Sequence, residues 1–274
     1  MEQTLNNESR GRQTKDGIRI YEAADFAGMH AAGRLAAEIL DAMAPLVMPG
    51  QTTGEIDRII TQMVDDAGAT SATIGYKGYK HASCISVNHV VCHGIPGDKV
   101  LKDGDILNID VTVIVDGWFG DTSRMYVAGK LPRKAERLIQ VTHDALMLGI
   151  ETVKPGNTFG DIGHAIQTYV EGHRMSVVRD FCGHGLGRVF HAPPNVLHYG
   201  RPGTGAVLEP GMIFTIEPMV NLGRPETKTL SDDWTAVTRD KSLSAQFEHS
   251  VGVTEDGVEI FTPSPVGKFH PTFG

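Results

Sequence analysis

The stretch Ile106–Val127, ILNIDVTVIVDGWFGDTSRMYV, decides the fold because it has the pattern of one β-hairpin with two unlike faces. The Asp-Gly pair at 116–117 is a strong signal for a two-residue turn between strands. Since side chains alternate along a strand, Asn108, Asp110 and Thr112 share one face. Apolar residues fill the opposite face, namely Leu107, Ile109, Val111, Val113 and Val115. The stretch therefore predicts an antiparallel hairpin with one face in a core.

The polar face of this hairpin carries two acidic residues close together. With the turn at 116–117, Asp110 pairs with Ser123, and Thr112 pairs with Asp121. Asp110 and Asp121 are then diagonal neighbours, roughly 7–8 Å apart at the backbone. Two carboxylates this close repel each other, so they need a cation between them or one must stay protonated.

Helical patterns come in pairs on either side of the hairpin. Thr52 begins a segment that has the form of a capping box with Glu55, a typical helix start. The expected helices cover 22–46, about 52–69, 134–153 and 158–171, and further strands are expected at 84–91, 212–216, 247–253 and 258–261. Helical pairs followed by runs of strands predict an α+β protein rather than alternating βαβ units.

An internal repeat relates the two halves of the chain. VMPGQTTGEI at 47–56 returns as VKPGNTFGDI at 153–162, and LKDGDILNID at 101–110 returns as LEPGMIFTIE at 208–217. A His-Gly-Ile-Pro run from His93 likewise resembles a His-Ala-Pro-Pro run from His191. The common order predicts two duplicated halves, and it places Asp110 and Glu217 at equivalent positions.

The second half adds two carboxylates and an imidazole to the candidate site. Glu217 ends a β-prone run just before a proline, which cannot continue a central strand. Glu248 shares a strand face with Gln246, while Phe247 points the other way. His184 lies in the glycine-rich run CGHGLG, which permits tight turns around one exposed imidazole.

These groups predict a dinuclear metal site. Four carboxylates carry four negative charges, which two divalent cations balance. One imidazole among oxygen ligands suits Mn²⁺, Fe²⁺, Co²⁺ or Zn²⁺ and argues against a purely calcium site. The sequence contains no HExxH zinc helix, GxSxG elbow or P-loop, so it excludes those alternative chemistries.

Composition limits the kind of protein further. The 274 residues carry a formal net charge of −8, which disfavours a nucleic-acid or anionic-membrane binder. Three cysteines without CxxC spacing indicate a reducing compartment, and the polar N-terminus shows no signal peptide. No segment has the 18 or more apolar residues that a membrane helix requires. We therefore expect a cytoplasmic protein.

On these residues the chain resembles the bacterial type I methionine aminopeptidases. The resemblance covers about 16–262, and the matching motifs are 92–96 (CHGIP), 108–112 (NIDVT), 120–123 (GDTS), 182–185 (CGHG), 190–191 (FH), 215–219 (TIEPM) and 248–249 (EH). It implies the pita-bread (creatinase/aminopeptidase-like) fold, with two pseudo-symmetric halves whose helices pack on a curved, mainly antiparallel sheet. The expected division is a flexible leader at 1–16, one catalytic domain at 17–262 with halves 17–130 and 131–262, and a tail at 263–274.

The resemblance also implies a role for each site residue. The five metal ligands fall on Asp110, Asp121, His184, Glu217 and Glu248. They would hold two divalent cations (Co, Mn, Fe(II) or Zn), with Asp121 and Glu248 bridging and a water between the metals attacking the peptide carbonyl. Glu217 would also handle protons.

His93 and His191 would flank the substrate, hold the scissile amide and stabilise the tetrahedral intermediate. The resemblance places the methionine pocket at Tyr76, Tyr79, Cys84, Phe190 and Trp234. The chain departs from the family pattern at Thr73, where relatives often carry cysteine, and at 80–83, where KHAS replaces a Pro-Lys-Ser run. We expect these departures to change the rim of the pocket and not the function.

The implied activity is removal of the initiator methionine from nascent chains, after deformylation, when the second residue is small and uncharged. The implied partners are N-terminal methionyl peptides, with the enzyme a monomer near the ribosome that binds neither nucleic acid nor membrane directly. One alternative is a proline-specific peptidase (aminopeptidase P or prolidase), although those enzymes usually carry an additional N-terminal domain. The other is a catalytically inactive binding protein on the same fold, although such proteins typically lose metal ligands and all five are present here.

Overall fold

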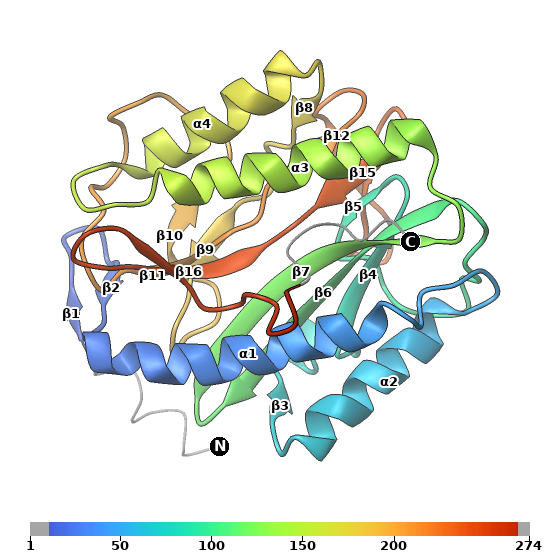
Figure 1. Ribbon diagram of the computed structural model, residues 1–274, viewed down its shortest axis with the longest axis horizontal. Coiled ribbons are helices and arrows are strands. Elements are labelled where there is room, and N and C mark those ends of the chain that lie inside the picture. The colour runs from blue at the N-terminus through green and yellow to red at the C-terminus, as the bar shows by residue number, and fades with distance from the viewer. Residues whose placement is uncertain (1–10, 268–274) are drawn as a thin grey trace.

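The computed structural model describes residues 11–267, which form two pairs of helices and a set of antiparallel strands (Figure 1). The helices are α1 (Phe26–Met43), α2 (Thr53–Asp66), α3 (Arg133–Glu151) and α4 (Phe159–Gly172), with short 3-10 helices η1 (Ala23–Asp25) and η2 (Tyr76–Gly78). In Figure 1, α1 and α2 lie along one side of the strands, and α3 and α4 lie along the other. The predicted α+β class is confirmed.

The strands are mostly short and form several small sheets around one long hairpin. Every strand pair among residues 11–267 is antiparallel. The strands are β1 (Arg12–Gln13), β2 (Arg19–Ile20), β3 (Thr70–Ser71), β4 (Ser83–Val87), β5 (Val90–Cys92), β6 (Asp105–Val115), β7 (Trp118–Ala128), β8 (Ser176–Val177), β9 (Gly183–Gly185), β10 (Ala192–Val196), β11 (Ile213–Ile216), β12 (Met219–Asn221), β13 (Thr227–Thr229), β14 (Ala236–Thr238), β15 (Ser244–Gln246), β16 (His249–Val253) and β17 (Val258–Ile260). One sheet has the order β3-β6-β4 with β7 beside β6, and another has the order β10-β9-β11-β16-β17.

The hairpin of β6 and β7 has the predicted register. Asp110 lies opposite Ser123 and Thr112 lies opposite Asp121. The turn residues at 116–117 both have positive φ, 49° and 79°, as an Asp-Gly turn requires. The apolar face of β6 lies in a core with α1, α2 and β4, so the predicted orientation of its two faces is confirmed.

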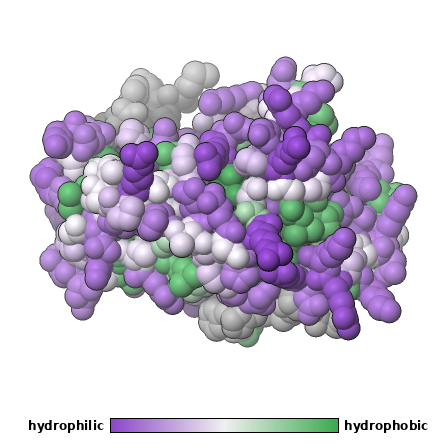
Figure 2. Space-filling view, turned by 90° about the horizontal axis from the view of Figure 1, so that it is seen from above, coloured by the Kyte–Doolittle hydropathy of each residue, from purple (hydrophilic) through white to green (hydrophobic). Residues whose placement is uncertain are grey.

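Two hydrophobic cores hold the helix pairs against the strands. The core beneath α1 and α2 contains Leu40, Ile56 and Ile109, while the core beneath α3 and α4 contains Leu146 and Ile166 together with residues of β11 and β16. The face seen from above in Figure 2, on the side of α3 and α4, is mostly hydrophilic with separate hydrophobic patches. The apolar stripes of these helices therefore face inward, as amphipathic helices require.

The predicted helices are present with small differences at their ends. α1 is shorter than the expected 22–46 because 23–25 form a 3-10 turn and the helix ends before Pro45. Thr52 caps α2 by accepting a hydrogen bond from the Glu55 backbone N–H at 3.1 Å. Within residues 11–267, no helix combines the length and apolar character needed to cross a membrane.

The expected single strand at 84–91 is wrong, because a turn divides it into β4 and β5. Asn88 lies at this turn with a φ of 56°. Its side chain donates to the Asp105 carboxylate at 2.8 Å and accepts from the Ile106 backbone N–H at 3.1 Å. Asparagine tolerates this left-handed conformation better than most residues, and these bonds hold it there.

The same backbone hydrogen bonds recur in both halves at the repeated decapeptides. Gly50 N–H donates to the Leu101 carbonyl at 2.8 Å, and Gly156 N–H donates to the Leu208 carbonyl at 3.1 Å. The reciprocal bonds run from the Leu101 N–H to Gln51 and from the Leu208 N–H to Asn157. In the first half these bonds hold the start of α2 beside the segment before β6, and in the second half they hold the start of α4 beside the segment before β11.

The expected leader and tail are only partly described. Of the expected leader at 1–16, residues 1–10 lie outside the described residues. In the described part, β1 (Arg12–Gln13) pairs with β2 (Arg19–Ile20). Arg12 also forms an ion pair with Glu209 at 2.6 Å. Of the tail at 263–274, residues 263–267 are described, and the Ser264 hydroxyl donates to the Asp41 carboxylate at 2.8 Å. The domain boundaries themselves stay a prediction.

Close backbone contact between α1 and β7 leaves no room for a side chain at Gly120. A Cβ there would lie 2.3 Å from the carbonyl carbon of Ala32. We expect Gly120→Ala to lower the free energy of unfolding by roughly 1–3 kcal/mol, the usual effect of overpacking. Urea denaturation measures the change. Gly172→Ala is the matched control, because no atom lies within 4 Å of its Cβ; an equal loss in the control would contradict the packing argument.

Candidate active site

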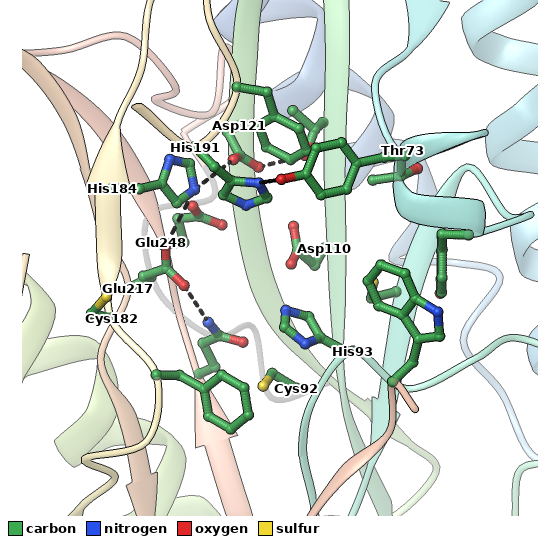
Figure 3. Close-up of a pocket in the computed structure, with 18 of the residues that line it drawn as sticks. Thr73, Cys92, His93, Asp110, Asp121, Cys182, His184, His191, Glu217 and Glu248 are labelled. Atoms are coloured by element: carbon green, nitrogen blue, oxygen red, sulfur yellow. Dashed lines mark hydrogen bonds and ion pairs between the residues drawn. The ribbon is translucent and has the colours of Figure 1, made fainter. Parts of the chain in front are cut away.

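A cavity of about 320 Å³ lies between the two halves of the chain and contains the predicted site. All twelve predicted site residues line it, namely Tyr76, Tyr79, Cys84, His93, Asp110, Asp121, His184, Phe190, His191, Glu217, Trp234 and Glu248. Figure 3 shows the labelled carboxylates and imidazoles pointing toward a common space. The structure thus brings these side chains together, while the role of each stays a prediction.

The five predicted metal ligands come from five different places in the chain. Asp110 lies on β6 and Asp121 on β7, while His184 lies on β9. Glu217 follows the last residue of β11, and Glu248 lies between β15 and β16. The first two belong to the half that holds α1 and α2, so both halves contribute to the site.

Three of the five form the tightest group. One ligand atom from each of Asp121, His184 and Glu248 lies within 4.8 Å of the others. His184 Nε2 lies 3.5 Å from Asp121 Oδ2 and 3.7 Å from Glu217 Oε1. Asp110 also lines the cavity, and its charge interacts with Asp121 and Glu217.

Neighbouring side chains fix the orientation of these carboxylates. Thr112 Oγ1 donates to Asp121 Oδ1 at 2.7 Å. Thr215 Oγ1 donates to Glu217 Oε1 at 2.8 Å and accepts from the His184 backbone N–H at 3.0 Å. Gln246 Nε2 donates to the other Glu217 oxygen at 3.2 Å. Partners of this kind hold metal ligands in place and tune their basicity.

The His184 ring is oriented so that one nitrogen faces the carboxylates. Nδ1 lies 3.1 Å from the Gly185 carbonyl, and a carbonyl only accepts, so Nδ1 carries the proton. Nε2 is then free to bind a cation. Burial alone would lower the pKa of His184, but the Asp121 hydrogen bond and the Glu217 charge outweigh it and raise the pKa.

The buried carboxylates are unfavourable as anions without a cation. Burial, followed by mutual repulsion, raises the pKa values of Asp110 and Glu248 well above the usual range. Burial likewise raises the pKa of Glu217 to about 7, although the His184 charge opposes the rise. Carboxylate oxygens together with one imidazole nitrogen suit divalent cations of the first transition row. The residues of this site therefore fit such cations.

Hydrogen bonds across the two halves hold Glu248 beside β7. Its backbone N–H donates to the Ser123 carbonyl at 3.1 Å, and its carbonyl accepts from Thr122 Oγ1 at 2.7 Å. Asn108 Nδ2 donates to the Gln246 carbonyl at 2.8 Å. The break between β15 and β16 thus points Gln246 and Glu248 into the cavity, while Phe247 lies in the core.

His93 and His191 occupy the same unusual backbone conformation. Their φ angles are 56° and 58°, a region sparsely populated by residues other than glycine. Burial lowers the pKa of His93. Burial and the charge of His184 lower the pKa of His191 to about 4. Both rings are therefore neutral near pH 7, and each offers one N–H and one lone pair to the cavity and its walls.

Aromatic side chains form one wall of the cavity. The Tyr79 and Trp234 rings lie 4.9 Å apart, as do those of Tyr76 and Phe190. The Tyr79 hydroxyl donates to the Ser83 carbonyl at 2.9 Å, so its polar end is satisfied. Burial raises the pKa of the Cys84 thiol beyond the physiological range, which keeps that wall uncharged.

One departure from the family pattern lines the cavity, and the other, at 80–83, lies between two lining residues, Tyr79 and Cys84. Thr73 lines the cavity, and its hydroxyl donates to the His81 carbonyl at 2.7 Å. His81 Nδ1 donates to the Asp57 carboxylate at 3.0 Å, and the Ser83 N–H and hydroxyl donate to the same carboxylate. These bonds join the segment 80–83 to α2.

Several lining residues were not found from the sequence as site residues. Among them are Cys92, Phe181, Cys182, Asn195, Met219 and Gln246. Thr215, which donates a hydrogen bond to Glu217, was also not found as a site residue. A signal existed for Thr215, because it precedes Glu217 by two positions and so shares its strand face. No local pattern identifies Phe181 or Asn195, whose places in the cavity depend on the packing of distant segments.

Comparison with known proteins agrees with this geometry. The sequence model of the family described as "Metallopeptidase family M24" matches residues 27–255 of this chain. The methionine aminopeptidase of Rickettsia prowazekii (strain Madrid E) is 56% identical over 257 residues, which are 93% of this chain and 99% of that protein.

Solved structures show the same relationship. The crystal structure of methionine aminopeptidase from Rickettsia prowazekii has a TM-score of 0.89 and 57% identity, and it covers 89% of this chain and 99% of that one. The prolidase from Pyrococcus horikoshii OT3 shares the fold alone, with a TM-score of 0.71 and 20% identity, and this chain covers 63% of it. The pita-bread fold is therefore confirmed, and the proline-specific alternative is not favoured. The chain belongs to metallopeptidase family M24, among its bacterial methionine aminopeptidases.

Proposed function

We propose that the chain is a metal-dependent aminopeptidase that removes the initiator methionine from nascent proteins. It acts after deformylation, when the second residue is small and uncharged. The observation that supports this most is the convergence of four carboxylates and one imidazole from both halves beside an aromatic wall. The name of the similar Rickettsia protein supports the same activity.

In this proposal Asp110, Asp121, His184, Glu217 and Glu248 hold two divalent cations (Co, Mn, Fe(II) or Zn). Asp121 and Glu248 would hold the cations together with His184, because one ligand atom of each lies in the tightest group. Bound dications supply Lewis acidity and lower the pKa of water. Thr112, Thr215 and Gln246 keep the carboxylates aimed into the cavity.

The remaining steps belong to side chains of the chain itself. Glu217 would accept a proton from the attacking water and return it to the leaving amine, because its buried carboxylate lies in the cavity and is held there by Thr215 and Gln246. His93 and His191 hold the scissile amide and donate to the oxygen that gains negative charge. Their neutral rings donate without adding a positive charge to a site built for cations.

The aromatic wall would bind the methionine side chain. Tyr76, Tyr79, Phe190 and Trp234 offer ring edges and faces, and Cys84 offers a neutral thiol. A thioether gains about 0.3–1.5 kcal/mol from each favourable contact with an aromatic ring. This apolar lining favours a thioether over a charged side chain of similar size.

The proposal also covers the setting of the enzyme. It acts as a monomer in the cytoplasm, close to the ribosome, without binding nucleic acid or membrane directly. Residues 17–262 form one catalytic domain. The net charge of −8 supports the exclusion of nucleic acid, because a general nucleic-acid surface is basic.

Hydrolysis of a small peptide panel tests this function. The substrates are Met-Ala-Ser, its N-formyl form and an Xaa-Pro dipeptide, each with chelator and after reloading with Mn²⁺, Fe²⁺, Co²⁺ or Zn²⁺. We expect metal-dependent release of methionine from Met-Ala-Ser alone. Cleavage of Xaa-Pro would favour the proline-specific alternative, and no turnover with any metal would favour an inactive binding protein.

Metal affinity is expected to depend on pH near neutrality. Because its pKa is raised to about 7, Glu217 of the metal-free chain holds a proton that a cation must displace. Mn²⁺ affinity should therefore fall as the pH drops below about 7, with proton release measurable by calorimetry in buffers of different ionisation enthalpy. By the same linkage, the metal-free fold loses stability as the pH rises through about 7, because the folded chain binds this proton more tightly. A flat affinity between pH 6 and 8 would contradict this prediction.

A further inference from the structure

Tyr76 makes a polar contact that its expected place in the methionine pocket does not explain. Its hydroxyl oxygen lies 2.7 Å from His191 Nδ1, and the bond is drawn as a dashed line in Figure 3. Tyr76 lies on η2, between the strands β3 and β4, whereas His191 immediately precedes β10. The hydrogen bond therefore joins the two halves of the chain directly over the cavity.

The chemistry of the pair determines which group donates. A phenol hydroxyl is a good donor, and an imidazole nitrogen is a much better acceptor than a phenol oxygen. The Tyr76 O–H therefore donates to Nδ1. In a neutral imidazole the remaining proton then lies on Nε2.

Neighbouring rings fix the plane of the His191 ring. Within residues 11–267, only the hydrogen bond from Tyr76 makes its two nitrogens different. The Phe190 ring stacks on it at 3.8 Å between centroids with an interplanar angle of 25°. The Tyr76 and His184 rings lie 5.0 and 4.3 Å from it. Ring contacts hold an imidazole equally well in either tautomer, whereas a hydroxyl donor at Nδ1 selects one.

We propose that Tyr76 is a positioning residue for His191, whose hydroxyl selects the tautomer that carries the proton on Nε2. This inference rests on the proposed function, in which His191 donates to the carbonyl oxygen of the scissile bond. An N–H aimed at that oxygen stabilises its growing negative charge, whereas a lone pair there would repel it. Tyr76 thus serves two purposes, with its ring on the apolar wall and its hydroxyl on the catalytic imidazole.

Replacement of Tyr76 by phenylalanine separates these two purposes. The ring remains, so the KM for Met-Ala-Ser should stay within about twofold, while kcat falls roughly 3- to 10-fold, the equivalent of one lost neutral hydrogen bond. Bound metal should stay unchanged. Tyr169→Phe is the matched control, because it also removes a hydroxyl, bonded to Asp144 at 3.1 Å, but lies outside the cavity. An unchanged kcat, or a rise in KM alone, would overturn the proposal.

A double-mutant cycle tests whether the hydroxyl acts through His191. In a His191→Ala background, Tyr76→Phe should cause no further loss of kcat. Losses that multiply would mean that the hydroxyl acts on the substrate itself, which overturns the proposal.

A measurement of the His191 tautomer, which does not depend on enzyme activity, tests this inference separately from the proposed function. In the Zn²⁺-loaded chain with ¹⁵N-labelled histidine, the His191 signals should show a protonated Nε2 in the wild type and a mixture of tautomers in Tyr76→Phe. The same mixture in both proteins would overturn the inference even if methionine is released. If the peptide panel shows no hydrolysis, the proposed function fails while the tautomer measurement still decides the role of Tyr76.

Discussion

Replacement of Glu248 by alanine is expected to abolish methionyl peptidase activity, with a loss of about 10³-fold or more in kcat/KM. Glu248 is buried, and one of its oxygens lies in the tight group with Asp121 and His184. Loss of a predicted metal ligand would remove Lewis-acid stabilisation of several kcal/mol, and each 1.36 kcal/mol corresponds to a factor of ten. Activity and bound metal should be measured on the same sample.

The fold should survive this substitution, because Glu248 is held by its backbone rather than by its carboxylate. The backbone bonds to Ser123 and Thr122 remain in any variant. Glu248→Gln keeps the side-chain volume and removes a buried acid that its neighbours repel, so this metal-free variant should unfold at a temperature at least as high as wild type. Glu151→Ala, on the exposed end of α3, is the control for the loss of one acidic residue. Wild-type turnover in Glu248→Ala would refute its assignment as a ligand.

Replacement of His191 by alanine is expected to lower kcat by about 10²- to 10³-fold with metal content unchanged. That is the usual effect of removing one donor to a developing oxyanion. The ring contacts His184 but lies outside the tight group of ligand atoms, so the cations should stay bound. His30→Ala, in a partly buried pair with Glu259 outside the cavity, is the matched control. A His191→Ala protein that has lost its metal would show that His191 acts on the metal site and not on the substrate.

The hairpin could be predicted from sequence because its signals are local. The Asp-Gly turn sets the register, and the alternation of polar and apolar residues sets the faces, so Asp110 and Asp121 followed from neighbouring residues alone. Asn88 shows the limit of this reasoning. Its left-handed turn depends on bonds to Asp105 and Ile106, which lie 17 and 18 positions further along the chain.

The gathering of the other site residues could not be derived from local pattern. His184, Glu217 and Glu248 meet the hairpin only because β9, β11 and β16 pair in one sheet and because Glu248 bonds to Ser123. The repeat indicated Glu217 as the counterpart of Asp110, and the family resemblance supplied the rest. The hydrogen bond from Tyr76 to His191 joins residues 115 positions apart, so no local spacing in the sequence predicts it.

The most direct test is anomalous diffraction from crystals of the Mn²⁺-loaded chain, recorded at a wavelength where manganese scatters anomalously. Two manganese peaks are expected inside the cavity, enclosed by Asp110, Asp121, His184, Glu217 and Glu248, in protein that releases methionine from Met-Ala-Ser. Active crystals with manganese bound elsewhere, or with none of these five side chains in contact with it, would contradict the assignment of the site.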